Sequence, residues 1–204
     1  MCANIVYTIY MTLKDYPPML LTEAKQLPDS AQWGYEAKLD GYRMLAESGP
    51  ERTTIWSRQG NNFTDRYPAV TRELPAALGG HSAVVDGEMV GFDQMGQPSF
   101  SVLRTKLPKV VYYIFDLLEL DGEPLIRQPL RDRREQLNSL VTPQPSVQVS
   151  EMFYNRDAIV EAARELKFEG VVATRLDSPY RPGIRSKDWL KQILIRHTDG
   201  FGRH

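Results

Sequence analysis

Residues 36–43 read Glu36-Ala37-Lys38-Leu39-Asp40-Gly41-Tyr42-Arg43, and they join two strand-like segments, 33–38 and 42–47. Asp40-Gly41 is typical of a tight turn between two strands. A lysine that ends a strand beside a glycine can be held rigidly and approached closely by a ligand. To attack phosphorus, the amine of Lys38 must lose its proton, which needs desolvation or nearby positive charge from Arg43 or a bound metal ion. Taken alone, the stretch fits a surface lysine beside a hairpin turn better.

The rest of the chain mixes strand-like segments with fewer helical ones. Alternating or continuous apolar patterns predict further strands at residues 53–57, 84–86, 88–92, 110–118, 171–173 and 189–195. Helices are predicted at residues 68–78, 99–106 and 130–141, and Asn155 can cap another that places Ile159, Ala162, Ala163 and Leu166 on one face. So many strands with scattered helices predict an α+β fold with antiparallel sheets, rather than a parallel βαβ array.

The composition is that of an ordinary globular domain. The chain has 204 residues, of which 42% are hydrophobic and 25% charged, enough for one domain with its own core. Its formal net charge is −1, whereas a free-standing nucleic-acid binder is usually more basic. Cys2 is the only cysteine, so an internal disulfide is excluded, and we expect a reducing, cytoplasmic location. The longest apolar run, 110–118, is too short to span a bilayer, so no membrane partner is expected.

Carboxylates stand beside glycines at two further places. Asp86-Gly87-Glu88 lies between two apolar runs, where one carboxylate could accept a ribose hydroxyl and support a metal ion. Turn chemistry alone favours a plain hairpin turn there. Glu169-Gly170 offers another carboxylate at the beginning of a strand. The alternative for that pair is a helix terminus with glycine in the C-cap region.

Cationic and aromatic side chains complete the set of candidates. Arg58 follows a predicted strand, with an exposed turn as the alternative. Phe115 lies in the apolar run, where composition alone favours a plain core residue. The stretch Arg185-Ser186-Lys187-Asp188-Trp189-Leu190-Lys191 is basic with an aromatic anchor, and its alternative is a solvated loop leading into an edge strand.

In order, these segments resemble the successive nucleotidyltransferase motifs of ATP-dependent DNA ligases, from about Pro18 to Lys191. One motif alone is common, but the ordered set is highly specific. Similarity to the bacterial end-joining type of ligase, which acts in DNA repair, is carried by two groups of residues: Tyr180-Arg181-Pro182-Gly183 with Arg185-Ser186 and Trp189-Leu190-Lys191, and Tyr112-Tyr113-Ile114-Phe115-Asp116-Leu117-Leu118 with Asp121-Gly122. The resemblance implies the ligase nucleotidyltransferase (ATP-grasp-like) fold: two antiparallel β-sheets flanked by helices, with the nucleotide in a groove between them.

The resemblance also implies a reaction. In such ligases the lysine of the first motif, matched by Lys38, attacks the α-phosphate of ATP and expels pyrophosphate. This is covalent catalysis, which divides one condensation into easier transfers. AMP then passes to the 5′-phosphate of nicked double-stranded DNA, and attack by the 3′-hydroxyl seals the strand. The matched positions imply Glu36 at the adenine edge, Arg43 at the sugar and phosphates, Arg58 at a phosphate, Glu88 at the ribose, Phe115 stacked on adenine, Glu169 at the metal, and Arg185 and Lys191 at phosphate groups. Mg²⁺, supported by Glu88 and Glu169, is the expected metal.

The chain departs from the family pattern at three places. Thr174 stands where the family usually has a basic residue, and Ile193 stands at the second lysine of the last Lys-x-Lys motif. Ile193 cannot contact phosphate through a charge, although Lys187 or Arg196 are candidate substitutes. We expect an N-terminal extension at 1–16, an adenylation domain at 17–196, and a tail at 197–204 where an oligonucleotide-binding (OB-fold) barrel would begin. No OB-fold domain is expected within the chain.

Three readings of function follow from these residues. The first is a ligase core that forms lysyl-AMP and seals DNA alone or with a partner, such as an OB-fold domain or a DNA-end-binding protein. The second is a degenerate domain that binds nucleotide or DNA ends without turnover. The third is an RNA ligase or a capping guanylyltransferase, and the stretch around Trp189 argues against capping. The near-neutral net charge predicts weak, salt-sensitive DNA binding by this chain alone.

Overall fold

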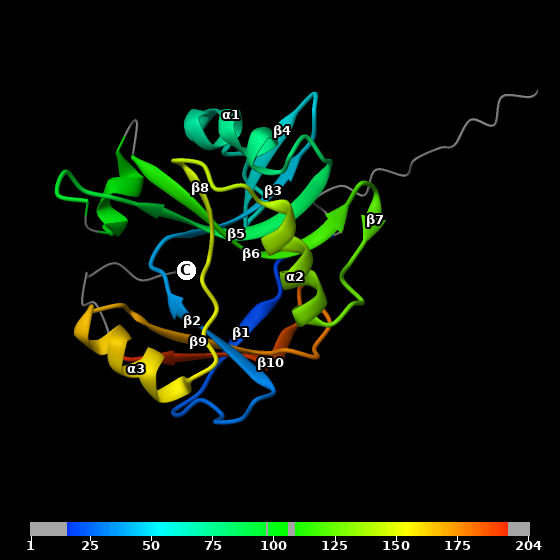
Figure 1. Cartoon of the computed structure of the whole chain (residues 1–204). Helices are drawn as coiled ribbons and strands as arrows, with labels where there is room; N and C mark the ends of the chain where they lie inside the picture. Colours follow the sequence, from blue (N-terminus) through cyan, green and yellow to red (C-terminus); the bar gives the residue numbers. More distant parts are fainter. Residues whose placement is uncertain (1–15, 97, 106–108, 196–204) are drawn as a thin grey trace, which may run out of the picture.

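Two β-sheets face each other, and helices cover their outer surfaces (Figure 1). This computed structural model describes residues 16–96, 98–105 and 109–195. The expected N-terminal extension, apart from Tyr16, and the expected C-terminal tail lie outside these residues. The α+β fold with two helix-flanked sheets, predicted from the sequence, is confirmed.

The smaller sheet has four strands in the order β1-β10-β9-β2. They are β1 (Leu20–Glu23), β2 (Trp33–Lys38), β9 (Gly170–Arg175) and β10 (Arg185–Ile193). β9 pairs antiparallel with β2 and with β10, whereas β1 joins β10 in parallel. β10 is therefore an interior strand, and the alternative of a loop leading into an edge strand is wrong for Arg185–Ile193.

The larger sheet follows the order β4-β3-β5-β6-β7, and β8 pairs with β6. Its strands are β3 (Tyr42–Ser48), β4 (Thr53–Ser57), β5 (Ala83–Gly91), β6 (Val110–Leu120), β7 (Glu123–Pro124) and β8 (Val147–Val149). All pairs are antiparallel except β6 with β8. β6 turns into β7 through Asp121-Gly122, both of which have positive φ angles, 49° and 84°. This is the backbone conformation for which Asp-Gly turns are selected.

Three α-helices pack on the sheets (Figure 1). α1 (Pro68–Ala77) begins with proline, which tolerates the first helical turn, and buries Val70, Leu74 and Ala77 in the core of the larger sheet. α2 (Leu130–Leu140) packs beside β6. α3 (Arg156–Glu165) lies on the smaller sheet, and the side chain of Asn155 accepts a hydrogen bond from the Ala158 amide as predicted. Short 3-10 helices span Thr64–Arg66 and Phe100–Arg104.

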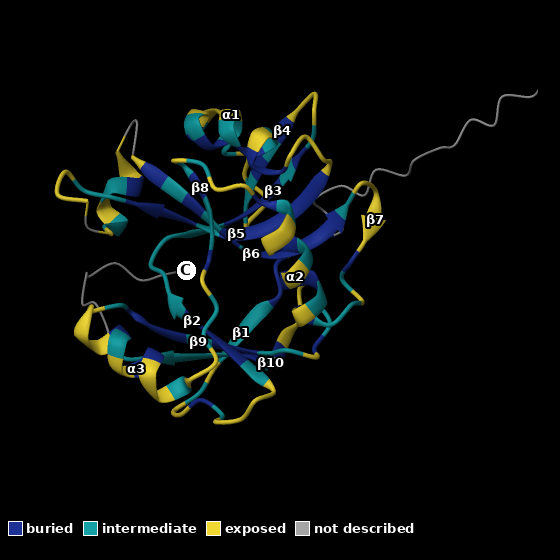
Figure 2. Ribbon diagram, in the orientation of Figure 1, coloured by how far each residue is buried: buried dark blue, intermediate teal, exposed yellow. Residues whose placement is uncertain are grey.

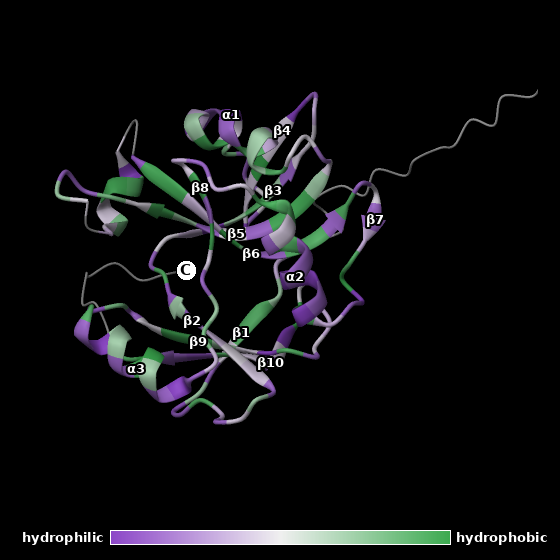
Figure 3. Ribbon diagram, in the orientation of Figure 1, coloured by the Kyte–Doolittle hydropathy of each residue, from purple (hydrophilic) through white to green (hydrophobic). Residues whose placement is uncertain are grey.

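Apolar residues form three buried clusters, which coincide with the layers of the fold (Figure 2). One lies under α1 on the larger sheet, one lies between the sheets, and one lies between the smaller sheet and α3. Hydrophobic residues follow the strands, whereas α2 is mostly hydrophilic (Figure 3). Two of its arginines, Arg133 and Arg134, are nevertheless buried. An interior arginine must be paired, and the partners of these two are important for the site below.

Asp40-Gly41 and Asp86-Gly87-Glu88 do not form the turns that local turn chemistry suggests. β2 and β3 belong to different sheets, so Asp40-Gly41 does not close a hairpin but carries the chain from one sheet to the other. A Cβ at Gly41 would lie 2.2 Å from the Met89 carbonyl oxygen, so the position requires glycine for close approach. Gly87 lies inside the continuous strand β5, and a Cβ there would lie 2.6 Å from the Tyr112 ring. The hairpin alternative for residues 86–88 is therefore wrong.

Other local predictions also need correction. α3 ends at Glu165, and Lys167 (φ 57°) follows it in the left-handed conformation, whereas Gly170 is already part of β9. Leu166 is 69% exposed, so the apolar face of α3 is formed by Ile159, Val160 and Ala163 instead. The strands β1 and β8 were not predicted, because each is only three or four residues long. Within the described residues, no helix is long and apolar enough to cross a membrane.

Candidate active site

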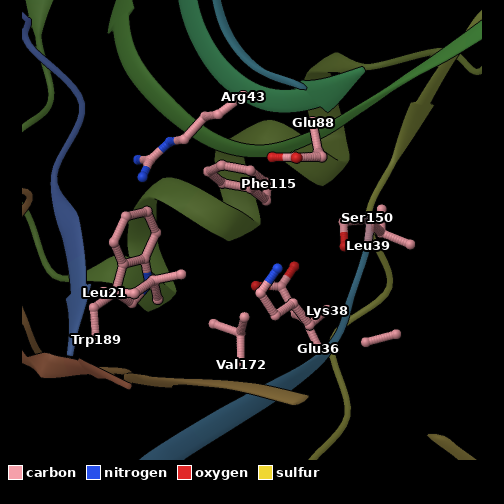
Figure 4. Close-up of a pocket in the computed structure, with 11 residues that line it drawn as sticks. Leu21, Glu36, Lys38, Leu39, Arg43, Glu88, Phe115, Ser150, Val172 and Trp189 are labelled. Carbon is pink, nitrogen blue, oxygen red and sulfur yellow. The ribbon is translucent and has the colours of Figure 1, made fainter. Parts of the chain in front are cut away.

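A cavity opens between the two sheets, next to the point where the chain crosses from one to the other (Figure 4). The smaller sheet contributes its inner face, the larger sheet contributes the opposite wall, and the crossing and the end of β8 close the sides. The lining residues are Leu21, Glu36, Ala37, Lys38, Leu39, Arg43, Glu88, Phe115, Ser150, Val172 and Trp189. Five of the residues selected from the sequence therefore meet in one place: Glu36, Lys38, Arg43, Glu88 and Phe115.

Lys38 is the last residue of β2, and its amine points into the cavity (Figure 4). Lys38 pairs across the sheet with Gly170, the first residue of β9, which brings the preceding Glu169 within reach. The Lys38 Nζ atom lies 2.6 Å from Glu169 Oε2, and the two side chains are 15% and 7% exposed. A Cβ at Gly170 would lie 2.0 Å from the Gln192 carbonyl oxygen, so this glycine allows β10 to approach closely. The amine is therefore fixed and largely removed from water, but remains at the cavity wall.

Glu88 faces the cavity from β5, on the opposite sheet (Figure 4). Burial raises the pKa of the Glu88 carboxyl to about 7; Lys38 and Arg43 oppose this shift, and Asp86 and Asp40 add to it. Desolvation disfavours the charged form of a carboxyl group, and here it outweighs the two cations. Perturbed carboxyl groups in a cleft are frequent at functional sites.

Arg43 connects the two sheets at the back of the cavity. Its guanidinium donates to Asp86 at 3.0 and 2.5 Å and to the Met19 carbonyl oxygen at 2.5 Å. The same group lies 5.3 Å from the centre of the Phe115 ring and 4.6 Å from that of Trp189. Asp86 is fully buried and also accepts a hydrogen bond from the Tyr180 hydroxyl at 2.7 Å. Arg43 thus lines the cavity while its donors are directed at protein groups, so its first effect is to fix the spacing of the two walls.

Glu36 lies on the same face of β2 as Lys38, one pleat earlier. Burial raises the pKa of the Glu36 carboxyl, opposed by Arg134 and by a hydrogen bond from the Ser150 side chain, with Asp116 adding to the rise. The Arg134 Nη1 atom lies 3.4 Å from Glu36 Oε1. A buried carboxylate with a cationic partner is suited to accept a hydrogen bond from a ligand in the cavity.

Three of the predicted cations do not line the cavity. Arg58 lies exposed after β4, with its amide bonded to the Arg43 carbonyl oxygen at 3.3 Å. Arg185 is exposed at the start of β10 and donates to the Leu21 carbonyl oxygen. Lys191 pairs with Val172 across the sheet, so it shares the inner face, and its Nζ atom lies 3.8 Å from Glu23 Oε2. Each is adjacent to a lining residue: Arg58 through the backbone of Arg43, Arg185 through the Leu21 carbonyl oxygen and Lys191 through its pairing with Val172.

The two departures from the ligase pattern also have defined positions. Ile193 pairs with Gly170, which in turn pairs with Lys38, so Ile193 lies in the same row of the sheet as the lysine. Thr174 is buried beside Trp189, and its hydroxyl has no hydrogen-bond partner among the described residues. Of the two candidate substitutes for a phosphate contact, Lys187 is exposed on β10 and Arg196 lies outside the described residues.

Some residues of the site were not selected from the sequence. Val172 and Trp189 lie within quoted motifs, so alternation along β9 and β10 would have placed them on the inner face with Lys191. Ser150 and Arg134 had no such signal, because their contacts join segments far apart in the chain. Asp86 is one of the two carboxylates of the Asp86-Gly87-Glu88 motif, but the sequence does not indicate its observed role, which is to be the buried acceptor for Arg43.

Comparisons with known proteins agree with this geometry. Over residues 12–192 the chain matches the family model described as "ATP dependent DNA ligase domain". It is 38% identical to the multifunctional non-homologous end joining protein LigD of Mycolicibacterium smegmatis, over 89% of this chain and 24% of that protein. It is 31% identical to a DNA ligase of Thermococcus onnurineus, over 87% of this chain and 36% of that one. A solved structure of mycobacterial DNA ligase D complexed with ATP and MES superimposes with a TM-score of 0.79 at 34% identity, covering 90% of this chain and 62% of that one. The chain thus spans about a quarter of the length of the LigD relative.

Proposed function

The chain belongs to the ATP-dependent DNA ligase domain family, and from this we propose that it is a nucleotidyltransferase core that takes AMP from ATP onto Lys38 and passes it to the 5′-phosphate of nicked DNA. The observation that supports this most directly is the position of the Lys38 amine. It lies at the wall of a cavity, 2.6 Å from one carboxylate, with an aromatic ring and a second carboxylate on the facing sheet.

The first step is attack on the α-phosphorus of ATP. The N–P bond forms at Lys38, the bond from the α-phosphorus to the bridging oxygen breaks, and pyrophosphate leaves with the electron pair. The amine must first give up a proton, and the Glu169 carboxylate at 2.6 Å is placed to accept it. The rigid backbone on both sides of Lys38 favours this step, because a fixed nucleophile loses little freedom on reaching the transition state.

The facing walls are suited to an adenine nucleotide. Phe115 from β6 and Val172 from β9 line the cavity from opposite sheets (Figure 4), and we place the flat base between them. Glu36 would accept a hydrogen bond from the base edge, and Glu88 would accept one from a ribose hydroxyl. Arg43 would lie under the sugar and phosphates. Arg58, Arg185 and Lys191, each next to a lining residue, would meet the phosphate groups of ATP or DNA.

The carboxylates fit a metal ion that arrives with the nucleotide. Within the described residues, no three acidic, histidine or cysteine side chains gather closely enough to hold a metal by themselves. Mg²⁺ usually keeps several waters and binds through one or two carboxylates plus substrate phosphates. Glu169, with support from Glu88, offers this kind of partial site. When bound, Mg²⁺ would neutralise charge on the phosphate oxygens.

Transfer of label from [α-³²P]ATP to the protein tests the proposal. The wild-type chain with Mg²⁺ should retain protein-bound label that is stable to alkali and released by acid, as expected for an N–P bond, whereas Lys38→Ala should retain none and removal of Mg²⁺ should prevent labelling. Lys25→Ala removes an exposed lysine outside the cavity and should label like the wild type. Chasing labelled protein with nicked DNA should move AMP to the 5′-phosphate. Absence of label on the wild-type chain at saturating ATP would exclude the proposal.

A second function has one specific observation in its favour. Ile193 occupies the row of Lys38, where a second lysine would reach the α-phosphate. A domain that binds nucleotide or DNA ends without turnover would have this property. Such a domain would bind ATP in equilibrium measurements but would remain unlabelled. Replacing nicked DNA by nicked RNA in the chase distinguishes an RNA ligase.

A further inference from the structure

A single side chain from outside the cavity contacts three of the residues that line it. Arg134, on α2, donates from Nη1 to the Phe115 carbonyl oxygen at 2.8 Å and from Nη2 to the Ser150 carbonyl oxygen at 2.5 Å. Its Nη1 atom also lies 3.4 Å from Glu36 Oε1. Arg134 is itself absent from the cavity lining. One guanidinium therefore ties β6, the end of β8 and β2, which belong to both sheets.

The contacts of Arg134 differ from those of an arginine that only forms a buried ion pair. The neighbouring Arg133 shows what a structural pair looks like: it holds Asp116 through two bonds of 2.8 Å, with side chains only 2% and 1% exposed. Arg134 instead directs its charge to a carboxylate at the cavity wall and its two terminal nitrogens to the backbone of the walls. Glu36 Oε1 accepts no hydrogen bond from any described residue. The charged group beside this oxygen is the Arg134 guanidinium, at 3.4 Å.

The groups that face Glu36 come from every element around it. Arg134 approaches from α2 and Ser150 from the end of β8, and Asp116 acts from β6. Lys38 lies on the same strand and face, and Lys191 lies in the same row of the sheet, beyond Val172. Asp116 is already paired with Arg133. Arg134 is therefore the cation with the shortest path to the Glu36 carboxylate.

We propose that Arg134 is a positioning residue that holds Glu36 ionised and aimed at the base, so that the cavity selects adenine over guanine nucleotides. The inference rests on the proposed function, because it takes Glu36 to meet the edge of the base. Adenine presents an amino group at the ring position where guanine presents a carbonyl oxygen. An ionised carboxylate accepts from the amino group and repels the carbonyl oxygen, whereas a protonated carboxyl group can donate to that oxygen. Without Arg134, burial favours the protonated form, and discrimination falls.

Equilibrium binding of the α,β-methylene analogues of ATP and GTP, which cannot transfer the nucleotide, provides the test. The wild-type chain should prefer the ATP analogue. Arg134→Met should lower this preference by about tenfold, the scale of one charge-assisted hydrogen bond. The preference should also decline with falling pH in both proteins, and at a higher pH in Arg134→Met than in the wild type. Equal preferences and equal pH profiles in the two proteins would overturn the inference.

Matched variants separate a positioning role from loss of packing. Arg131→Met removes an exposed arginine of the same helix, 61% exposed, and should leave the preference unchanged. Glu36→Gln should lower the preference to a value that does not vary with pH, and adding Arg134→Met to it should lower the preference no further. Arg134→Lys retains a charge but not the planar fork. It is the variant to compare if Arg134→Met does not fold. Because one ammonium cannot bind three acceptors, Arg134→Lys should lower the preference for the ATP analogue about threefold. A wild-type preference in Arg134→Lys would overturn the inference.

The labelling experiment separates this inference from the proposed function. If the wild-type chain accepts no label from either [α-³²P]ATP or [α-³²P]GTP, the proposed function fails. If the wild-type chain is labelled by ATP and Arg134→Met keeps the wild-type ratio of ATP to GTP labelling, only the inference about Arg134 fails.

Discussion

Glu88 shows how one buried carboxyl group affects stability. Its pKa is raised by burial from an ordinary 4.5 to about 7, so the folded chain holds a proton between these values that the unfolded chain has lost. The stabilisation is complete below about pH 4.5 and is lost as the pH rises through about 7. We predict that Glu88→Gln, which cannot ionise, is more stable than the wild type at about pH 8, by on the order of 1 kcal/mol for a group at an open cavity.

Urea unfolding without Mg²⁺ or nucleotide measures this difference. The two proteins should unfold at nearly the same urea concentration at about pH 4.5, and Glu88→Gln should need more urea at about pH 8. A variant that is less stable than the wild type at both pH values would contradict the prediction.

Ile193 gives a prediction about rate. A lysine at this position would lie in the row of Lys38 and Gly170, on the inner face of the smaller sheet. If the α-phosphate lies over Lys38, the added ammonium would stabilise the charge that develops on its oxygens. We predict that Ile193→Lys raises the rate of protein labelling by [α-³²P]ATP by roughly tenfold to a hundredfold.

Gln192→Lys provides the matched control, because the side chain of Gln192 points to the opposite face and bonds to the Lys25 carbonyl oxygen. It adds the same charge to the same strand and should leave the labelling rate unchanged. A gain in both variants would show that overall charge, and not position, is responsible.

At the scale of elements, the crossing between β2 and β3 has the strictest requirement. A Cβ at Gly41 would lie 2.2 Å from the Met89 carbonyl oxygen and 3.0 Å from Glu88 Cγ, and the Met89 backbone cannot move away without separating β3 from β5. We predict that Gly41→Ala lowers the free energy of unfolding by about 2–4 kcal/mol. Gly60→Ala is the comparison: its φ is 82° with nothing within 4 Å, so only backbone strain of about 1–2 kcal/mol applies. Urea unfolding of both variants checks the order, and a smaller loss in Gly41→Ala would contradict it.

The sequence predicted most elements but not how they pair. The alternation in Trp33–Lys38 and the apolar run at 110–118 were sufficient to place β2 and most of β6 (Val110–Leu120), because these patterns are local. Asp40-Gly41 and Asp86-Gly87-Glu88 were misleading, because a glycine selected for close approach resembles a glycine selected for a turn. Which of the two applies depends on the Met89 carbonyl oxygen and the Tyr112 ring, and these lie far along the chain.

For the whole molecule, charge decides how DNA can be bound. The net charge is −1, so any attraction to DNA must come from local cations such as Arg58, Arg185 and Lys187, which are exposed. If about three phosphates are neutralised, affinity for nicked duplex should fall by roughly tenfold to fiftyfold between about 50 and about 200 mM salt.

Fluorescence anisotropy at several salt concentrations measures this slope. Arg58→Ala with Arg185→Ala should make it shallower by about two phosphate contacts. A salt-independent affinity would contradict the prediction, since binding would then not depend on phosphate charges.

The candidate site could be predicted only in part, because many of its contacts join segments that are far apart in the sequence. Glu36, Lys38, Arg43, Glu88 and Phe115 were each identified from ordered motifs, and all five line one cavity. The residues that support them could not be identified: Asp86 bonds to Arg43 only once β3 has paired with β5, and Arg134 reaches Glu36, Phe115 and Ser150 only after both sheets are formed. Buried polar partners are set by tertiary distance, and no periodicity in the sequence records that distance.

The crossing at residues 39–41 has a mechanical consequence. Lys38 belongs to the smaller sheet, whereas Glu88 and Phe115 belong to the larger one. The segment that links β2 to β3, and so one sheet to the other, is only three residues long. A small slide of one sheet over the other would therefore shift the nucleophile relative to its target without deforming either sheet. Arg43, held in place by Asp86 on the larger sheet, bonds to the Met19 carbonyl oxygen and lies over the Trp189 ring of the smaller sheet, so these contacts resist that slide and keep the Lys38 amine in register with the facing wall.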